Sequence, residues 1–289
     1  MENIRFADAQ SRMDVRRMWK KVFGDDDAYM ELYFGSKYRD ENTLVYFHDN
    51  AAAASLQMLP YTFTFHGVEI EIAYVMGVCT LPEFRGQGFQ DALLRKMLQV
   101  LSERNIPLAI LVPAEPWLIG FYEKYGFAQT FDAADTNLPS LRELNKVANI
   151  NEAYSSFDAH FRDADMTVQK SPEDFKVIMR EAQLFNFPEK KNLISMSRVI
   201  DAEYLLSIFA RQHLDKQFEL NIEDEILSQN NKSYQISNGE VCAQTVTSAT
   251  QINIKLLNRL LLGYRTAELP LPFSQIFPEK SPQINFMLE

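Results

Sequence analysis

The stretch from Val78 to Leu94 constrains the fold most, because it sets an apolar strand, a short turn and an amphipathic helix in direct succession. Arg85, Gly86 and Gly88 make up the turn. The first amides of a helix have no partner within the helix and carry the positive end of its dipole, and glycine lets the backbone approach an anion closely. The stretch therefore predicts a cradle for a phosphate or pyrophosphate, to which Arg85 adds a charge-assisted contact. It lacks the Lys-Ser/Thr pair of an ATP-binding P-loop.

The composition narrows the class of protein. The chain has 289 residues, enough for two domains, and its 46% hydrophobic and 24% charged residues are typical of a soluble globular protein. A formal net charge of −10 argues against nucleic-acid binding and suits a cationic amine. Cys79 and Cys242 lie far apart, which predicts reduced thiols in the cytoplasm, and the scattered histidines predict no metal site. No apolar run approaches the ~20 residues that cross a bilayer, so we expect no membrane partner.

The order of predicted elements defines a mixed α+β chain. Residues 1–138 read as a strand, two helices, a run of antiparallel strands and then strand–helix–strand–helix–strand. Residues 139–190 look mostly helical and polar, and we interpret them as a connecting segment. A last block, 191–289, begins with an expected strand at Ser195–Val199 and continues with helices and short strands. We therefore expect a larger N-terminal domain and a smaller C-terminal α+β domain.

Two motifs in the first domain carry a family resemblance. Val78-x-Thr80-x-Pro82-x-x-Arg85-Gly86-x-Gly88 resembles the acyl-CoA pyrophosphate loop of the GNAT superfamily of N-acetyltransferases. Further along, Phe121-Tyr122-Glu123-Lys124-Tyr125-Gly126-Phe127 is similar to the second recurrent segment of that superfamily, a tyrosine shortly before Gly-Phe. Together the motifs cover roughly residues 1–135 and imply a GNAT fold with a twisted, mostly antiparallel sheet and flanking helices.

The C-terminal half resembles one branch of that superfamily. Gln90 stands where the family normally has a small residue, and a bulky residue there is typical of the enhanced-intracellular-survival (Eis-like) type. In that type a degenerate acetyltransferase-like domain and a sterol-carrier-like domain follow. The last block resembles the carrier domain through three segments, namely Ser197–Asp201, the hairpin around Asn230-Asn231 and Asn238-Gly239, and the helix 256–263. The middle segment is too short for a full domain, so we interpret it as a remnant or a replacement.

The resemblance implies acetyl-CoA as the cofactor and a set of residues that bind it. Backbone groups of Val78 and Thr80 would pair with the pantetheine amides of acetyl-CoA. The pyrophosphate would be held by Arg85, Gly86, Gln87, Gly88 and Phe89.

The resemblance also implies that Tyr122 is the general acid. When an amine attacks the thioester, a thiolate leaves; a free thiol has a pKa of ~8.5 and a phenol one of ~10, so proton donation by Tyr122 needs modest tuning. The alternative is that Tyr122 is a core aromatic of an amphipathic helix. Phe121, Tyr125 and Phe127 illustrate how common aromatic residues are here.

The base is less defined. In the Eis-like type the free C-terminal carboxylate enters the active site, and this chain ends in an apolar segment, Ile284–Glu289, that we expect to be docked. The α-carboxylate of Glu289 is then a candidate base, unless the tail packs for stability alone. Glu115, just after the strand that ends at Val112, is the alternative carboxylate.

Residues of the acceptor side are open to two interpretations. Asp26 belongs to an acidic run that could line an amine-binding cleft, or it caps the following helix. Tyr33 and Trp117 could shape the acceptor pocket, or they are simply buried.

The sequence thus predicts an N-acetyltransferase that moves an acetyl group from acetyl-CoA to a primary amine by direct attack in a ternary complex. The acceptor could be a small molecule or a protein, and relatives of this type form homo-oligomers. Two alternatives stay open, a lipid- or sterol-binding carrier and a non-catalytic acyl-CoA sensor.

Overall fold

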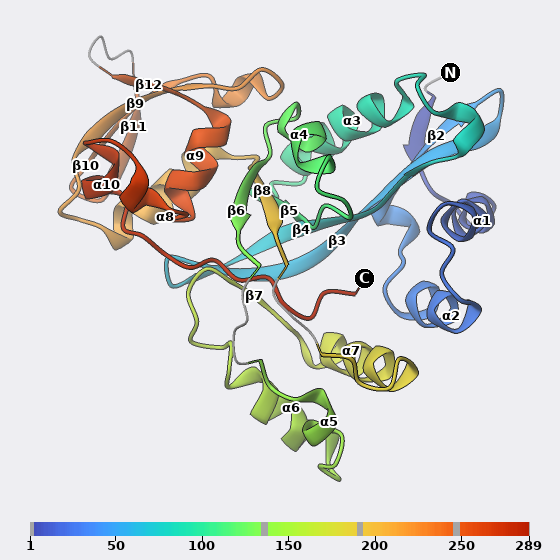
Figure 1. Cartoon of the computed structure of the whole chain (residues 1–289). Coiled ribbons are helices and arrows are strands. Elements are labelled where there is room, and N and C mark those ends of the chain that lie inside the picture. Colours follow the sequence, from blue (N-terminus) through green and yellow to red (C-terminus); the bar gives the residue numbers. More distant parts are fainter. Residues whose placement is uncertain (1–2, 134–137, 190–192, 245–248, 289) are drawn as a thin grey trace.

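A large twisted sheet forms the centre of the molecule (Figure 1). The computed structural model describes residues 3–133, 138–189, 193–244 and 249–288. The strands follow the order β1-β2-β3-β4-β5-β8-β6, and β7 adds to a free part of the β3 edge. Their bounds are β1 Ile4–Phe6, β2 Thr43–His48, β3 Ala51–Phe65, β4 Val68–Thr80, β5 Leu108–Leu111, β6 Ala128–Phe131, β7 Thr167–Gln169 and β8 Ser195–Val199.

The long hairpin of β3 and β4 spans the sheet and separates two hydrophobic cores. Its turn, His66-Gly67, has φ values of 47° and 75°, which is the left-handed geometry that matches strand twist in a two-residue turn. Successive side chains of a strand point to opposite faces. Accordingly Tyr61 and Phe63 belong to one core, whereas Met58 belongs to the other.

Helices cover both faces of the sheet, as expected for a GNAT fold. Helices α1 (Ser11–Phe23) and α2 (Asp27–Ser36) pack on the face that carries Tyr61. Helices α3 (Phe89–Glu103) and α4 (Leu118–Glu123) pack on the opposite face. We call these the α1/α2 face and the α3/α4 face.

The strand Ser195–Val199 corrects the expected division of the chain. We expected it to open the C-terminal block, but as β8 it lies inside the large sheet, antiparallel to both β5 and β6. All five of its residues are buried. The sequence could not reveal this, because pairing with β5 and β6 depends on contacts that are distant along the chain.

The connecting segment is mostly helical, as expected, with one exception. It contains α5 (Leu141–Leu144), α6 (Ile150–Asp158) and α7 (Pro172–Leu184). The exception is β7, which pairs antiparallel with the end of β3 from Thr62 to Thr64. This segment therefore extends the first sheet as well as linking the two halves of the chain.

A smaller sheet and its helices follow β8. Its strand order is β11-β10-β9-β12, and the expected hairpin at Asn238-Gly239 joins β10 to β11. The helix expected at 256–263 begins two residues earlier, at Ile254, directly after the strand β12. The bounds are α8 Ala202–Gln212, β9 Phe218–Glu223, β10 Ser233–Ser237, β11 Glu240–Ala243, β12 Thr250–Asn253, α9 Ile254–Leu261 and α10 Phe273–Ile276.

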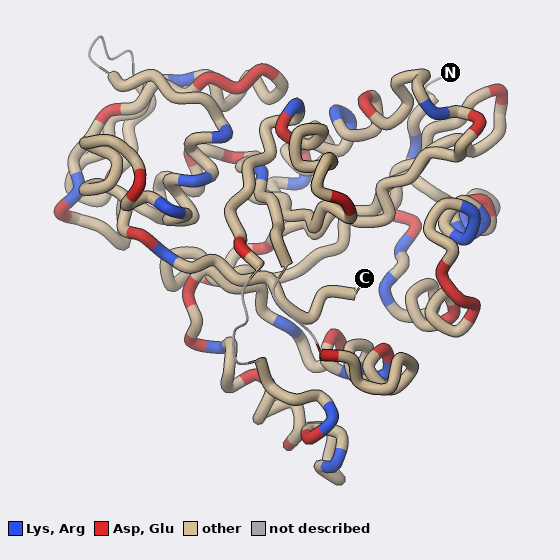
Figure 2. The backbone as a smooth tube through the Cα atoms, viewed as in Figure 1, with Lys and Arg blue, Asp and Glu red and all other residues tan. Residues whose placement is uncertain are grey.

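The C-terminal tail returns from α10 to the large sheet and ends between the sheet and α2 (Figure 1). Gln283 forms a bridge to Thr167 of β7. The five residues from Ile284 to Leu288 are all at most 4% exposed. No charged residue occurs between Lys280 and Glu289, and the tube of Figure 2 is accordingly tan there. The expectation that this apolar end is docked is confirmed up to Leu288.

Candidate active site

A gap between two neighbouring strands marks the candidate site. β4 and β5 run parallel, but they pair only at Ala73–Ala109 and Tyr74–Ile110. β4 continues to Thr80, and in the described part of the chain no strand pairs with it on this side beyond Tyr74. Backbone groups that lack a strand partner can pair with the amides of a bound molecule.

A bulge in β4 accompanies this gap. The β3–β4 register shifts between Ser55 and Gln57, opposite Gly77 and Val78. Gly77 has a φ of 60°, and a Cβ there would lie 2.5 Å from the ring of Trp19, so only glycine fits. Bulges turn a strand away from regular pairing and are common beside active sites. The bulge places Val78 in the part of β4 that has no partner on the β5 side.

The turn after β4 has the geometry of an anion cradle. Pro82–Phe84 form a short 3₁₀ turn, and Gly86 and Gly88 follow with φ values of 79° and 80°. A Cβ at either glycine would meet nothing within 4 Å. Gly88 is the N-cap of α3, and no side chain caps the helix. The first amides of α3 are thus available to an anion, as the sequence predicted.

The side chains of the turn lie close to that cradle. Arg85 is exposed, and its Nε–H donates to the carbonyl oxygen of Thr80 at 3.3 Å. Gln87 reaches the carbonyl of Glu83 at 3.5 Å. Phe89 differs from the rest, because its ring is buried and stacked 4.2 Å from that of Tyr46. Any contribution of Phe89 to anion binding must therefore come from its backbone amide.

Gln90, the residue that departs from the GNAT pattern, joins the turn to the gap. Its Oε1 accepts a hydrogen bond from the hydroxyl of Thr80 at 3.2 Å. This contact ties the last residue of β4 to the first turn of α3. The bulky side chain therefore has a structural function where the family usually has a small residue.

Tyr122 lies on α4 in the core of the α3/α4 face. It is 5% exposed, and its ring centroid is 5.9 Å from that of Phe127. Burial raises the pKa of Tyr122 above its ordinary value of 10, so the phenol is protonated at neutral pH. Tyr125 packs beside it and donates to Asp91 at 3.0 Å, which fits a structural role.

The tail reaches the other face of the same sheet. Leu288 belongs to the core of the α1/α2 face, together with Tyr74 and Ile110, where β4 and β5 last pair. Glu289, the predicted base, lies outside the described residues. Tyr122 and the end of the tail thus stand on opposite faces of a sheet that is open between β4 and β5.

The four candidate acceptor residues lie in different environments. The carboxylate of Asp26 accepts from the backbone N–H of Tyr29 at 2.7 Å, which is the capping interpretation. Tyr33 is fully buried, and its hydroxyl donates to Gln57 at 2.6 Å. Trp117 is 70% exposed, so the burial interpretation is wrong for this residue. Glu115 is exposed in the same loop after β5.

The sequence did not reveal the residues that support the segment Tyr122–Phe127, which we call the Tyr122 segment. They come from β8 and α9. Arg198 of β8 is fully buried and donates to the carbonyl of Tyr125, and Asn258 of α9 donates to that of Gly126. An arginine within the expected strand Ser195–Val199 was the available signal, because a guanidinium that becomes buried requires partners.

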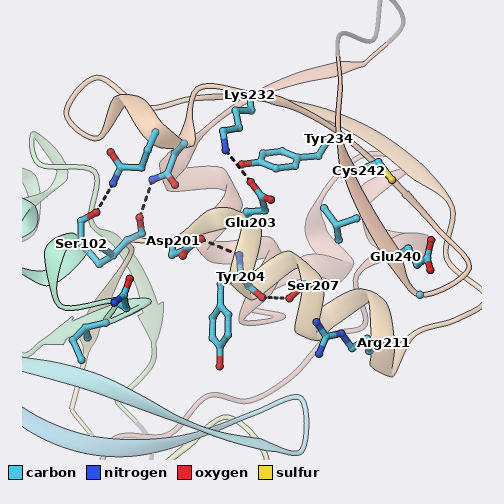
Figure 3. A pocket seen from close by; sticks show the side chains of 17 residues that line it. Ser102, Asp201, Glu203, Tyr204, Ser207, Arg211, Lys232, Tyr234, Glu240 and Cys242 are labelled. Atoms are coloured by element: carbon cyan, nitrogen blue, oxygen red, sulfur yellow. Dashed lines mark hydrogen bonds and ion pairs between the residues drawn. The ribbon is translucent and has the colours of Figure 1, made fainter.

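A separate hollow of about 740 Å³ lies between the end of α3, α8 and the β10–β11 hairpin (Figure 3). Its wall is largely polar, with the Glu203–Lys232 ion pair at 2.9 Å and Arg211 among the side chains. Neither the turn after β4 nor Tyr122 contributes to it. A sterol or lipid needs an apolar tunnel, so this hollow does not favour the carrier alternative.

Two further properties of the described residues bear on function. No group of three or more His, Cys, Asp or Glu side chains among them could hold a metal ion. Within the same residues, no helix has the length and apolar character required to cross a bilayer.

Family models match both halves of the chain. Residues 3–130 match the acetyltransferase (GNAT) domain, and residues 202–269 match the sterol carrier protein domain. The second match begins after β8, in agreement with the place of that strand in the first sheet. No curated protein sequence matches the chain.

Solved structures resemble the chain over its whole length. A probable N-acyltransferase from Enterococcus faecalis V583 has a TM-score of 0.69 at 14% identity and covers 97% of this chain and 98% of its own. Eis1 from Mycobacterium abscessus has a TM-score of 0.72 at 13% identity, covering 98% and 99%. A GCN5-related N-acetyltransferase from Anabaena variabilis has a TM-score of 0.65 at 16% identity, covering 96% and 98%. At such identities the likeness concerns the fold.

The chain therefore consists of a GNAT acetyltransferase domain followed by a sterol carrier protein domain. Residues 3–130 thus form a GNAT acetyltransferase domain, a class whose acetyl donor is acetyl-CoA, and the fold of the chain is similar to that of Eis1.

Proposed function

We propose that this protein transfers an acetyl group from acetyl-CoA to a primary amine, which attacks directly in a ternary complex. The residues present fit the cofactor. β4 has an unpaired backbone edge around Val78 and Thr80, and the turn from Arg85 to Phe89 leaves open space above Gly86 and Gly88. When bound, acetyl-CoA supplies the acetyl thioester and, after transfer, a thiolate that must be protonated.

Tyr122 is the proton donor in this proposal. Burial keeps its phenol protonated at neutral pH, so Tyr122 carries the proton it donates before the reaction begins. Proton transfer to a thiolate also requires that the pKa of the thiol be raised. Burial has this effect on a thiol of the same sheet, because it raises the pKa of Cys79 to about 11. Desolvation thus raises the pKa of the leaving thiol as well as that of Tyr122, and the thiolate becomes a stronger base for the proton that Tyr122 donates.

The α-carboxylate of Glu289 is the proposed proton acceptor for the attacking ammonium. Two observations support it, the burial of the tail from Ile284 to Leu288 and the presence of Leu288 in the same core as Tyr74 and Ile110. Glu115 remains the alternative carboxylate. Acid and base would then act from opposite faces of the sheet, which lets cofactor and acceptor meet in the gap.

The observation that carries the proposal is the gap between β4 and β5 with a glycine-rich helix start at one end. We expect Tyr122→Phe to lower kcat by about two orders of magnitude, because a general acid is lost. The dissociation constant of CoA should stay within about twofold. Thiol release with a panel of amines and calorimetry with CoA measure the two quantities. Equal loss of turnover and CoA binding would remove Tyr122 from the acid role.

A non-catalytic acyl-CoA sensor is the rival that the same panel tests. Such a protein would bind CoA and release no thiol with any amine. A sensor would need Tyr122 for packing only, and the match of Tyr122 to the second GNAT segment leads us to favour the enzyme.

A further inference from the structure

The backbone that follows Tyr122 is held by side chains from elsewhere in the chain. The Nε–H of Arg198 donates to the carbonyl oxygen of Tyr125 at 2.8 Å. The side-chain amide of Asn258 donates to the carbonyl oxygen of Gly126 at 3.3 Å. Both side chains are fully buried, so water does not compete for these contacts.

Arg198 is in turn fixed by a carboxylate of the C-terminal domain. The two oxygens of Asp224 accept from one nitrogen of the guanidinium at 2.7 and 2.8 Å. Asp224 is 3% exposed and also accepts from the backbone amides of Ile226 and Leu227, both at 3.1 Å. The side chain of Asn230 donates to it at 2.9 Å. A buried charge pair with its remaining hydrogen bonds satisfied holds one geometry.

Asn258 joins the same two parts of the molecule. While its amide nitrogen donates to Gly126, its oxygen accepts from the backbone N–H of Val199 in β8 at 2.7 Å. Helix α9, which carries Asn258, belongs to the matched sterol carrier domain. One carboxamide thus links that domain to β8 and to the Tyr122 segment.

The packing around Gly126 leaves no room for a Cβ. Its φ is 81°, and a Cβ there would lie 2.7 Å from Nε of Arg198 and 2.9 Å from a methyl carbon of Ile254. The segment can therefore approach Arg198 only with glycine at this position. The C-terminal domain thus contacts the residues that follow Tyr122 directly.

We propose that Asp224 and Asn258 are positioning residues for acetyl transfer, because they clamp the segment that carries Tyr122, Asp224 acting through Arg198. The inference rests on the proposed function, in which Tyr122 is the acid. It gives the sterol carrier domain a role in catalysis that requires no lipid. A displacement of about 1 Å of a catalytic group costs ~100-fold in rate, so loosening this clamp should lower kcat.

Asp224→Asn tests the clamp, because it keeps the shape of the side chain and removes its charge. We expect kcat to fall at least tenfold, with the KM for acetyl-CoA within about twofold, since no hydrogen bond or ion pair among the described residues joins the turn from Arg85 to Phe89 to this network. Asn258→Ser, which removes the donor to Gly126, should lower kcat in the same way. It carries the test alone should Asp224→Asn not fold.

Tyr264→Phe is the matched control. The hydroxyl of Tyr264 also joins the two halves of the chain, accepting from Gln129 at 3.0 Å and donating to Asp132 at 2.7 Å, but beyond the Tyr122 segment. It should lower thermal stability without lowering kcat at a temperature well below unfolding. A loss of kcat in the control equal to that in Asp224→Asn overturns the clamp.

A double-mutant cycle with Tyr122→Phe separates positioning from general damage. If Asp224 acts through Tyr122, its substitution should cause no further loss of kcat once the phenol is absent. Losses that multiply overturn the proposal. So does an unchanged kcat in both Asp224→Asn and Asn258→Ser while Tyr122→Phe is impaired. An unchanged kcat in Tyr122→Phe itself overturns the assignment of Tyr122 as the acid, and the clamp with it. The result for Tyr122→Phe therefore distinguishes failure of the proposed function from failure of the clamp alone.

Discussion

At the scale of single residues, Lys170 departs most from what its chemistry prefers. It is 2% exposed, its ammonium lies 5.3 Å from the ring centroid of Tyr61, and its Nζ donates to the carbonyl of Val168 at 3.5 Å. In the described residues no carboxylate forms an ion pair with it. Burial, with a smaller contribution from Lys37, lowers the pKa of Lys170 to about 7. Folding therefore costs this side chain its proton or its hydration.

This predicts a pH-dependent gain in stability for Lys170→Met. Between pH 7 and about 10 an unfolded lysine binds more protons than folded Lys170, so the stability of the wild type rises with pH in that window. Methionine removes this dependence. The variant should be more stable than the wild type at pH 7, with a difference that shrinks towards pH 10, measured by urea unfolding at several pH values. Lys176→Met, at an exposed position of α7, is the control. A difference that does not change with pH would contradict the prediction.

At the scale of elements, the tail combines packing with a proposed chemical role, and the two can be separated. Met287 and Leu288 are each 2% exposed, and burying such a side chain is worth ~1.5–3 kcal/mol. Removal of Met287–Glu289 should therefore lower both the unfolding temperature and kcat. Residues appended after Glu289 should lower kcat alone, because they displace the α-carboxylate and keep the packing. Glu289→Gln, which changes only the side chain, should leave both unchanged. Full activity of the extended chain would exclude the α-carboxylate as the base.

The elements also show which features of the fold could be predicted from the sequence. The strand, turn and helix from Val78 onward could be predicted because glycine, capping and helix periodicity act over a few residues. The bulge at Gly77 could not, since it depends on contact with Trp19 of helix α1, which packs on the sheet. Likewise Tyr122 is recognised by local spacing, whereas Arg198 and Asp224 meet only after the chain has folded.

At the scale of the whole molecule, the position of β8 changes where the boundary between the two domains lies. The expected boundary after residue 138 cuts through the first sheet, because β8 lies between β5 and β6. We propose that the acetyltransferase unit ends after β8, near residue 200, with 139–190 as an excursion from it. Helix propensity and turn signals gave the elements their type. Strand order is a non-local property that they do not determine.

A fragment of residues 1–138 should therefore fail to fold. Without β8, β6 has no partner strand in the described sheet, and β5 keeps only its two residue pairs with β4. Extension to residue 200 restores the strand but leaves Arg198 buried without Asp224, which costs several kcal/mol. We expect neither fragment to unfold cooperatively or to bind CoA, whereas the full chain does both. Circular dichroism during urea unfolding and calorimetry with CoA measure this. Cooperative unfolding of the 1–138 fragment with undiminished CoA affinity would show that the first sheet does not depend on β8.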